Sequence, residues 1–305
     1  MCRDKILIIR AGALGDTLML MPLIKVLRRD YEIIVLGRRP GIDYLEPYTD
    51  KCIDIERGGW HQLFNNSAGD IPVPQVNYVT AFINDRENIV YGNLNHLFSG
   101  SKINIFPPFP DINSQVHVAL HMAYGFKSSG IPLDFMSGFD RAFREPLMDS
   151  RINEGGKKIV LHPGSGSKKK NYSPKFWFDL LIHIKMTGSL ESKVICILTG
   201  PAEEDNAGVF KEYADRFMAE LYICPDREEL LTILNNTCLY IGHDSGVTHL
   251  AAMLGIHTIA FFKNSSIEQW HPLGPSVKVI GPDENPDRIL KNIAGEIQAM
   301  FCRRP

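Results

Sequence analysis

The chain has 305 residues, of which 44% are hydrophobic and 22% charged, and its formal net charge is −2 at pH 7. This length favours two domains, each long enough to bury its own core, and the near-neutral charge produces no field that would favour nucleic acid as a partner. The 6 cysteines are scattered without a C-x-x-C pair, which argues against a zinc site and against a secreted disulfide framework.

The chain begins as an open α/β sheet. The apolar run K-I-L-I-I-R at residues 5–10 is typical of a strand buried on both faces. It starts close to Met1 without the long apolar region or cleavage site of a leader peptide, so we expect a cytoplasmic protein. A helical stripe of apolar residues at 18–27 and a second strand at 32–36 follow. The β-loop-α-β order predicts an α/β fold.

The rest of the first half carries weaker signals. We predict a strand at 53–55, a helix at 116–124 and a long loop at 58–74, which is rich in Gly, Asn, Ser and Asp. Long loops in compact domains are often functional. The charged, irregular stretch 138–156 predicts an interdomain linker, with the boundary after residue 150.

A second α/β pattern occupies the other half of the chain. Ser173 and Pro174 are a good helix start, as N-cap and first helical residue. Asp226 and Glu229 form a capping box, and residues 286–300 form a final amphipathic helix. Strands are predicted at 158–162, 193–198, 220–224, 239–241, 257–262 and 277–280. In open α/β sheets, ligands bind beyond the carboxyl ends of such strands.

The turn Gly12-Ala13-Leu14-Gly15-Asp16 follows the first strand. Glycine lets the backbone approach a ligand closely, and the next helix offers free N–H groups at its N-terminus. The turn lacks the third glycine of the G-x-G-x-x-G dinucleotide fingerprint. Asp16 therefore has two interpretations, a helix N-cap or a general base at the mouth of a cleft.

The turn 162–167, reading H-P-G-S-G-S, precedes three lysines at 168–170. Its N–H groups and hydroxyls can point at a phosphate while a lysine supplies the counter-charge. The pattern is not a Walker loop, and a solvated flexible turn is the alternative. In the turn 199–205, Glu203 and Glu204 either complement a helix dipole or accept hydrogen bonds from ribose hydroxyls.

The segment 242–252 ends a strand and begins a helix through an Asp-Ser-Gly turn. The helix N-terminus with Ser245 and Thr248 predicts an anion site. Asp244 beside a diphosphate would be repelled unless it bonds backbone N–H groups or sugar hydroxyls. His249 is either a packing residue or part of the site, and no G-x-S-x-G elbow supports a hydrolase. The later loop 267–275 resembles one that shapes a pocket, although taken alone it is interpreted as structural.

Taken in this order, the turns resemble glycosyltransferase family 9, which contains the heptosyltransferases of the lipopolysaccharide core. The matching pieces are I-L-I-I-R-A-G-A-L-G-D-T, H-P-G-S-G-S-K-K-K-N-Y-S-P-K-F-W, L-T-G-P-A-E-E-D, I-G-H-D-S-G-V-T-H-L-A-A-M-L-G and W-H-P-L-G-P. They cover the first 40 residues and most of the C-terminal half, whereas residues 40–155 carry little of the resemblance. Tyr172-Ser173 stands where the family usually has Trp-Pro.

The resemblance implies a GT-B fold of two Rossmann-like domains with parallel sheets facing each other across a cleft. Residues 1–150 would form the acceptor-side domain and residues 151–285 the donor-nucleotide-binding domain. Residues 286–305 would form a helix that packs back on the N-terminal domain.

The resemblance also implies roles for individual residues. Asp16 matches the family's catalytic base, and Lys170 matches a lysine that contacts the donor phosphates or ribose. Either Glu203 or Glu204 would hold the ribose. The segment from Asp244 to His249 matches the D-[ST]-G-x-[ST]-H motif. The full set of expected donor-binding residues is Gly15, Ser165, Gly166, Ser167, Lys170, Thr199, Gly200, Glu203, Glu204, Asp244, Ser245, Gly246, Thr248 and His249.

The implied activity is inverting transfer of a sugar from a nucleotide sugar, with ADP-heptose expected, to a lipopolysaccharide-type saccharide. The chain has no D-x-D triplet, so we expect no metal and no cofactor besides the nucleotide sugar. A lipid-linked acceptor would bring the protein to the inner face of the cytoplasmic membrane. The alternatives are a UDP- or GDP-sugar transferase, a sugar-nucleotide epimerase, a non-catalytic nucleotide-sugar-binding protein and an NAD-dependent oxidoreductase.

Overall fold

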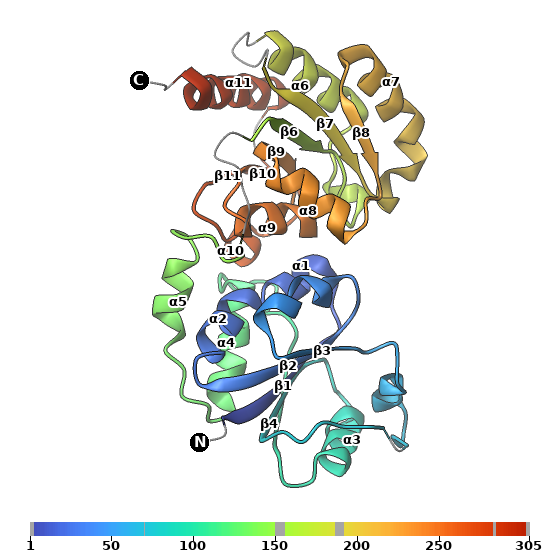
Figure 1. Cartoon of the computed structure of the whole chain (residues 1–305), viewed down its shortest axis with the longest axis vertical. Coiled ribbons are helices and arrows are strands. Elements are labelled where there is room, and N and C mark those ends of the chain that lie inside the picture. The colour runs from blue at the N-terminus through green and yellow to red at the C-terminus, as the bar shows by residue number, and fades with distance from the viewer. Residues whose placement is uncertain (1–2, 70, 150–155, 187–191, 283–284, 303–305) are drawn as a thin grey trace. The chain divides into compact units, whose positions relative to one another are not determined.

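The chain folds into two compact units, Met1–Leu147 and Met148–Pro305, each built on one parallel β-sheet (Figure 1). The computed structural model describes residues 3–69, 71–149, 156–186, 192–282 and 285–302. Residues 150–155 of the predicted linker lie outside the described residues.

The first unit contains a 5-stranded sheet with the order β3-β2-β1-β4-β5. Its strands are β1 (Asp4–Arg10), β2 (Tyr31–Gly37), β3 (Lys51–Asp54), β4 (Tyr78–Phe82) and β5 (Lys102–Phe106). In the register of the sheet, Ile6 of β1 pairs with Ile33 and with Tyr78. Residues 6–9 are completely buried, because the central strand is covered on both faces, as its apolar run predicts.

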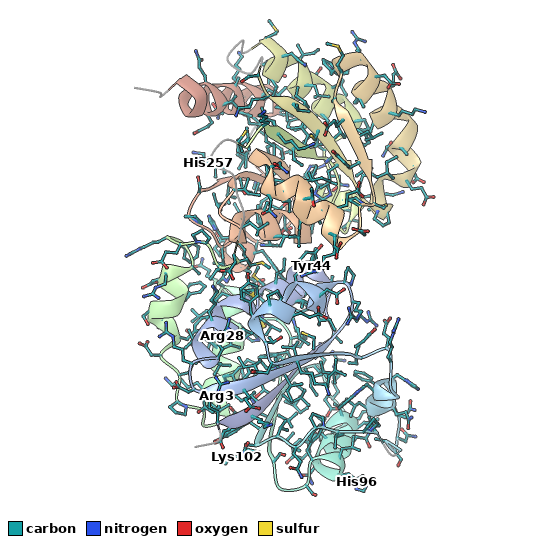
Figure 2. The ribbon with its side chains drawn as sticks, viewed as in Figure 1. Arg3, Arg28, Tyr44, His96, Lys102 and His257 are labelled. Carbon is teal, nitrogen blue, oxygen red and sulfur yellow. The ribbon has the colours of Figure 1, made fainter. Side chains whose placement is uncertain are left out.

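Short helices surround this sheet. They are α1 (Leu14–Leu18), α2 (Met21–Leu27), η1 (Gly41–Tyr44), η2 (Glu46–Tyr48), η3 (Trp60–Phe64), α3 (Ile89–Leu97), α4 (Val118–Ser128) and α5 (Phe135–Arg141). The apolar stripe that predicts one helix is split into α1 and α2, because Pro22 lacks the N–H that would continue the first. Arg3 joins the start of β1 to the end of α2, where its Nη1 donates to the Arg28 carbonyl oxygen at 3.0 Å (Figure 2).

Two predictions for the first unit hold only in part. The predicted loop 58–74 contains η3, whose Trp60 is buried and stacks on Phe98 with ring centroids 6.5 Å apart. The predicted linker 138–156 includes the end of α5, whose Phe135 is buried. In η3, tertiary burial of an aromatic side chain outweighs a polar local composition.

The second unit contains a 6-stranded sheet with the order β11-β10-β9-β6-β7-β8. Its strands, all close to the predicted positions, are β6 (Lys158–His162), β7 (Val194–Thr199), β8 (Glu220–Ile223), β9 (Thr237–His243), β10 (His257–Phe261) and β11 (Val277–Ile280). The central β6 pairs with β7 on one side and with β9 on the other. The turns after these three strands therefore lie side by side at the carboxyl edge of the sheet.

Helices flank the second sheet in Figure 1. They are η4 (Lys168–Lys170), α6 (Pro174–Met186), η5 (Pro201–Asn206), α7 (Ala207–Phe217), α8 (Arg227–Asn235), α9 (Gly246–Met253), α10 (Ile267–Trp270) and α11 (Pro286–Cys302). The predicted starts of α6 and α8 are confirmed, and Asp226 caps α8 by accepting from the Glu229 N–H at 2.9 Å.

The last helix, α11, buries Ile289, Leu290, Ile293 and Ile297 in the core of the second unit, beside α6. Its predicted contact with the first unit stays a prediction. In the part of the chain that the structure describes, no helix combines the length and apolar character needed to cross a membrane.

Candidate functional site

In the first unit, Asp16 lies just beyond the carboxyl end of β1. It is the third residue of α1, and its Oδ2 accepts the N–H of Ala13 at 2.9 Å. The N-cap position belongs to Ala13, so the interpretation of Asp16 as the N-cap is wrong. The turn needs Gly12, because a Cβ there would come within 2.4 Å of the Asp16 Cβ. Gly15 lies half-buried in the first turn of α1.

Arg10, the last residue of β1, is a neighbour of Asp16 that the motif analysis did not single out. Its side chain is only 2% exposed, and its Nη2 lies 4.0 Å from Asp16 Oδ1. Its Nη1 donates to the Pro108 carbonyl oxygen at 2.8 Å, and the guanidinium lies over the Phe109 ring at 4.7 Å. Burial lowers the pKa of Arg10, and the charge of Asp16 partly opposes this. In the sequence, Arg10 could have been noticed as a charged residue at the end of an otherwise apolar strand.

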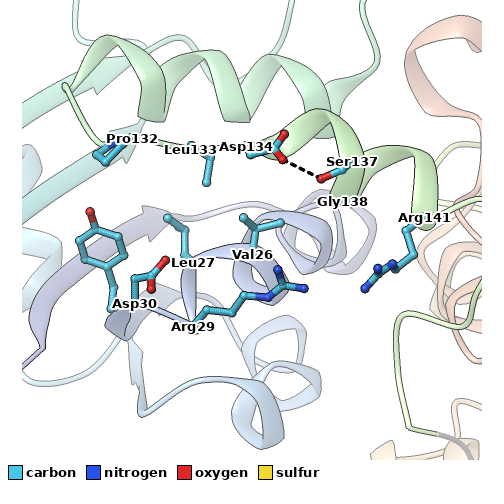
Figure 3. Close-up of a pocket in the computed structure, with 11 residues that line it drawn as sticks. Val26, Leu27, Arg29, Asp30, Pro132, Leu133, Asp134, Ser137, Gly138 and Arg141 are labelled. Atoms are coloured by element: carbon cyan, nitrogen blue, oxygen red, sulfur yellow. Dashed lines mark hydrogen bonds between the residues drawn. The ribbon is translucent and has the colours of Figure 1, made fainter.

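Three cavities of the first unit differ in their position on the sheet. One of about 410 Å³ lies beyond the carboxyl end of β4 and is lined by Phe64 and by residues 84–87. A second, of about 130 Å³, lies between α2 and α5. The third, of about 180 Å³, lies where α2 ends and β2 begins, against α5. Arg29 and Arg141 extend into this space in Figure 3. Only the first cavity shares the carboxyl edge with Asp16.

In the second unit, Asp244 connects two predicted donor-binding residues. Its Oδ2 accepts from Lys170 Nζ at 2.6 Å, and its Oδ1 lies 3.4 Å from His249 Nε2. Asp244 is 5% exposed, and burial alone would raise its pKa, but His249 and Lys170 hold the pKa well below its usual range. Asp244 therefore stays ionised, and the charge repulsion expected beside a diphosphate is offset by these two partners.

Ser245 is the N-cap of α9 and belongs to a buried hydrogen-bond network. Its Oγ accepts the Thr248 N–H at 3.3 Å and lies 3.0 Å from Thr248 Oγ1. The Tyr240 hydroxyl lies 3.2 Å from Thr248 Oγ1 and 2.7 Å from His162 Nδ1. Burial lowers the pKa of His162 to about 4, so this imidazole is neutral at pH 7. The network orients the first turn of α9, which includes Gly246 and whose N–H groups favour an anion.

The small-residue turn after β6 is held by its own contacts. The buried Ser165 Oγ lies 2.6 Å from Asn171 Oδ1 and accepts the Ser167 N–H at 3.3 Å. Gly166 is exposed, and a Cβ there would meet nothing within 4 Å. Of the three lysines, Lys168 pairs with the exposed Asp205, Lys170 pairs with Asp244, and the Lys169 side chain is exposed.

Glu203 joins the turn after β7 to the turn after β6. It is buried, and its Oε2 accepts the Gly200 N–H at 2.9 Å. Burial raises its pKa, while hydrogen bonds from the backbone of Gly200 and Ser165 oppose the increase. A Cβ on Gly164 would come within 1.9 Å of Glu203 Oε2, so the two turns are in direct contact. Glu204 is exposed.

The other residues of these turns have structural partners. Thr199 is buried and donates to the Tyr222 carbonyl oxygen at 3.3 Å. After β10, Lys263 Nζ donates to the Asn171 carbonyl oxygen at 3.2 Å, and Asn264 Nδ2 donates to that of Lys169 at 2.6 Å. No motif pointed to this loop, which anchors the lysine turn.

The loop 267–275 packs on α9, since a Cβ on Gly274 would come within 2.1 Å of the Ala252 carbonyl oxygen. Trp270 lies near His249, with ring centroids 6.2 Å apart. Within the described residues, no group of three or more His, Cys, Asp or Glu could hold a metal ion.

A family model described as glycosyltransferase family 9 (heptosyltransferase) matches residues 113–295. The chain belongs to glycosyltransferase family 9. A relative named lipopolysaccharide heptosyltransferase 1, from Campylobacter coli, is 26% identical over an alignment of 297 positions that covers 85% of this chain and 83% of that protein. The predicted family is therefore confirmed, and with it the enzyme class, a glycosyltransferase.

Solved structures of the family share the fold. A family 9 glycosyltransferase from Veillonella parvula has a TM-score of 0.68 at 14% identity and covers 97% of this chain and 90% of its own. The E. coli heptosyltransferase WaaC with ADP has a TM-score of 0.65 at 15% identity and covers 96% and 99%. The E. coli ADP-heptose lps heptosyltransferase II has a TM-score of 0.63 at 16% identity and covers 97% and 99%. The predicted GT-B fold is confirmed, whereas the roles of individual residues stay predictions.

Proposed function

We propose that the protein is an inverting, metal-independent heptosyltransferase that transfers heptose from ADP-heptose to a lipopolysaccharide-type saccharide. The observation that most supports this is the match of the family 9 model to residues 113–295, because these include every turn assigned to the donor except that of Gly15. The name of the Campylobacter coli relative supports the heptose and the acceptor class. The WaaC structures with ADP and with ADP-2-deoxy-2-fluoro heptose support the donor.

The donor half of the proposed site is the carboxyl edge of the second sheet. The diphosphate would bind at the N-terminus of α9 and at the turn 165–167, with Lys170 as its cationic partner. Lys170 is already paired with Asp244, so an incoming diphosphate would compete with that carboxylate for the ammonium group. Glu203 is used by backbone N–H groups, which leaves the exposed Glu204 as the better candidate to accept from the ribose hydroxyls.

The proposed reaction is a single displacement. Asp16 takes the proton of the acceptor hydroxyl as that oxygen attacks the anomeric carbon from the face opposite the nucleotide. The bond from the anomeric carbon to the diphosphate oxygen breaks, and the nucleoside diphosphate leaves with the electron pair, which inverts the configuration. The logic is that of inverting glycoside hydrolysis with a sugar hydroxyl in place of water. Lys170 and the α9 N-terminus stabilise the negative charge of the leaving group.

The acceptor half would be formed by the first unit. The loops after β1 and β4 share its carboxyl edge, and the cavity of about 410 Å³ at residues 84–87 lies there. A saccharide that is lipid-linked would place the protein in the cytoplasm with peripheral contact to the inner membrane face. No metal, no cofactor other than the nucleotide sugar, and no nucleic acid take part in this proposal.

The decisive first measurement is thermal stabilisation of the full chain by ADP, UDP, GDP, their sugar conjugates and NAD. A ligand at 100 times its Kd stabilises a fold by about 2.7 kcal/mol, which gives a measurable shift in Tm. We expect ADP and ADP-heptose to give the largest shifts. A larger shift with UDP or GDP sugars would refute the heptose donor, and a shift with NAD alone would refute nucleotide-sugar binding.

Transfer of radiolabelled heptose to a truncated lipopolysaccharide then separates a transferase from an epimerase and from a non-catalytic binding protein. Product formed in the presence of EDTA is expected, because the proposal places the metal's role on Lys170 and a helix N-terminus. Loss of product with EDTA and its return with Mg²⁺ would refute the metal-independent mechanism.

A further inference from the structure

The guanidinium of Arg10 is buried but incompletely hydrogen-bonded. Its Nη1 donates to the Pro108 carbonyl oxygen, whereas Nε and Nη2 have no hydrogen-bond acceptor among the described residues. A buried charge is normally paired and hydrogen-bonded. Arg10 instead has one carboxylate nearby, that of Asp16, at 4.0 Å from Nη2. Unmatched donors on a buried guanidinium do not stabilise the fold. The position of Arg10 beside Asp16, the proposed general base, therefore requires another explanation.

We infer that Arg10 is a positioning residue that orients the carboxylate of Asp16 for proton abstraction, an inference that rests on the proposed role of Asp16. The two carboxylate oxygens have different restraints. Oδ2 accepts the Ala13 N–H at 2.9 Å, and Oδ1 faces the positive charge of Arg10. Together these restraints select one rotation of the carboxylate, in which Oδ1 is the oxygen left to take the acceptor proton.

The 4.0 Å separation is important for this role. At this distance the attraction between the charges orients the carboxylate, but no hydrogen bond occupies the lone pairs of Oδ1. A bidentate arginine–carboxylate pair would use both oxygens and leave Asp16 a poorer base.

The guanidinium is kept at that distance by the loop after β5. Pro108 accepts from Nη1, and the ring of Phe109 covers the guanidinium at 4.7 Å. These contacts come from residues 98 and 99 positions later in the chain. The proposed base is thus connected to a second loop of the acceptor-side unit, through one side chain.

A double-mutant cycle in turnover tests the inference, with Arg10→Met, Asp16→Asn and the double variant. We expect Arg10→Met to lower kcat by about 10²-fold, the cost of a misplaced catalytic group, with the donor Kd unchanged. In the Asp16→Asn background the same substitution should cause no further loss. Arg10→Lys keeps the charge and should recover part of the turnover. Arg29→Met, the same change at an exposed arginine of this unit, is the matched control and should keep full turnover.

Equal losses in both backgrounds, or a loss that appears only as weaker donor binding, would overturn the inference. The same cycle in Tm measures the Arg10–Asp16 interaction without any activity, and additive shifts would also overturn it. A wild-type chain that transfers no sugar would refute the proposed function, while the Tm cycle would still decide whether the two residues are coupled. Full turnover of Asp16→Asn would refute Asp16 as the base and the inference with it.

Discussion

The carboxyl edges of the two sheets are built in different ways. In the second unit, the turns after β6, β7 and β9 are joined to one another by Lys170–Asp244 and by Glu203 at Gly164. In the first unit, Asp16 accepts a hydrogen bond from its own turn and has the charge of Arg10 at 4.0 Å, and a cavity lies elsewhere along the same edge. The turns of the proposed donor half are therefore joined by direct contacts, whereas the proposed acceptor half depends on separate loops. Four predictions test this comparison, from the largest expected effect to the smallest.

Asp16→Asn should lower kcat by about 10²- to 10⁴-fold, the usual contribution of a general base, because an amide cannot take the proton. Donor affinity, measured by calorimetry with ADP, should stay unchanged, since the proposed donor residues other than Gly15 lie in the other unit. Asp140→Asn, at an exposed carboxylate of α5, is the control. Unchanged turnover in Asp16→Asn would show that the first unit does not supply the base.

Lys170→Met should weaken ADP binding by about 10- to 10²-fold, which corresponds to the loss of one charge-assisted hydrogen bond. Lys169→Met is the matched control, because the side chain of Lys169 is exposed and its backbone carbonyl, which accepts from Asn264, is kept in the variant. Calorimetric Kd values for both variants give the answer. Equal losses of ADP affinity in the two variants would mean that the lysines act only through their combined positive charge. The contrast between the joined turns of the donor half and the separate loops of the acceptor half would then fail.

Gly164→Ala should destabilise the second unit by about 1–3 kcal/mol, the usual cost of overpacking, because its Cβ would meet the Glu203 carboxylate. Gly166→Ala, two residues later in the same turn, has open space and should be close to neutral. Urea unfolding of both variants measures the difference. A neutral Gly164→Ala would show that the two turns move independently.

Stability of the second unit should fall as the pH falls below about 6.5. Burial lowers the pKa of His162 to about 4 and that of His243 to about 3, whereas the unfolded chain takes up protons near its ordinary pKa of 6.5. The unfolded state therefore binds more protons over this range, and stability rises with pH. Between pH 6.5 and 5.5 the expected loss is about 1 kcal/mol for each histidine.

Unfolding of His162→Gln at several pH values checks this dependence, which should become shallower. The same substitution at His96, an exposed histidine of the first unit labelled in Figure 2, is the control for the change itself. If stability depends on pH equally in His162→Gln and in the wild-type chain, the buried hydrogen-bond network at the start of α9 does not contribute to that dependence.

Local patterns predicted the second unit better than the first. The apolar runs of β6 and β9 and the N-cap Asp226 act within a few residues, so they can be read from the chain. Strands β4 and β5 and helix α3 were missed. In β5 the polar Asn104 interrupts the apolar pattern, and its side chain is satisfied by the Gly125 carbonyl oxygen at 2.7 Å, a contact 21 residues away in the chain. Helix α7 was also missed, because it buries only Phe210 and Ala214.

The sequence alone determined which strands end in small-residue turns, where the helices after them begin, and the family to which the ordered motifs belong. These features are local, because a glycine, a capping side chain or an apolar run acts on the residues next to it. Only the tertiary structure decided that Asp244 faces Lys170, that Glu203 rather than Glu204 is buried, and that Arg10 lies between Asp16 and Pro108. Parallel strands bring turns from distant parts of the chain to one edge, so side chains there find partners that no local pattern specifies.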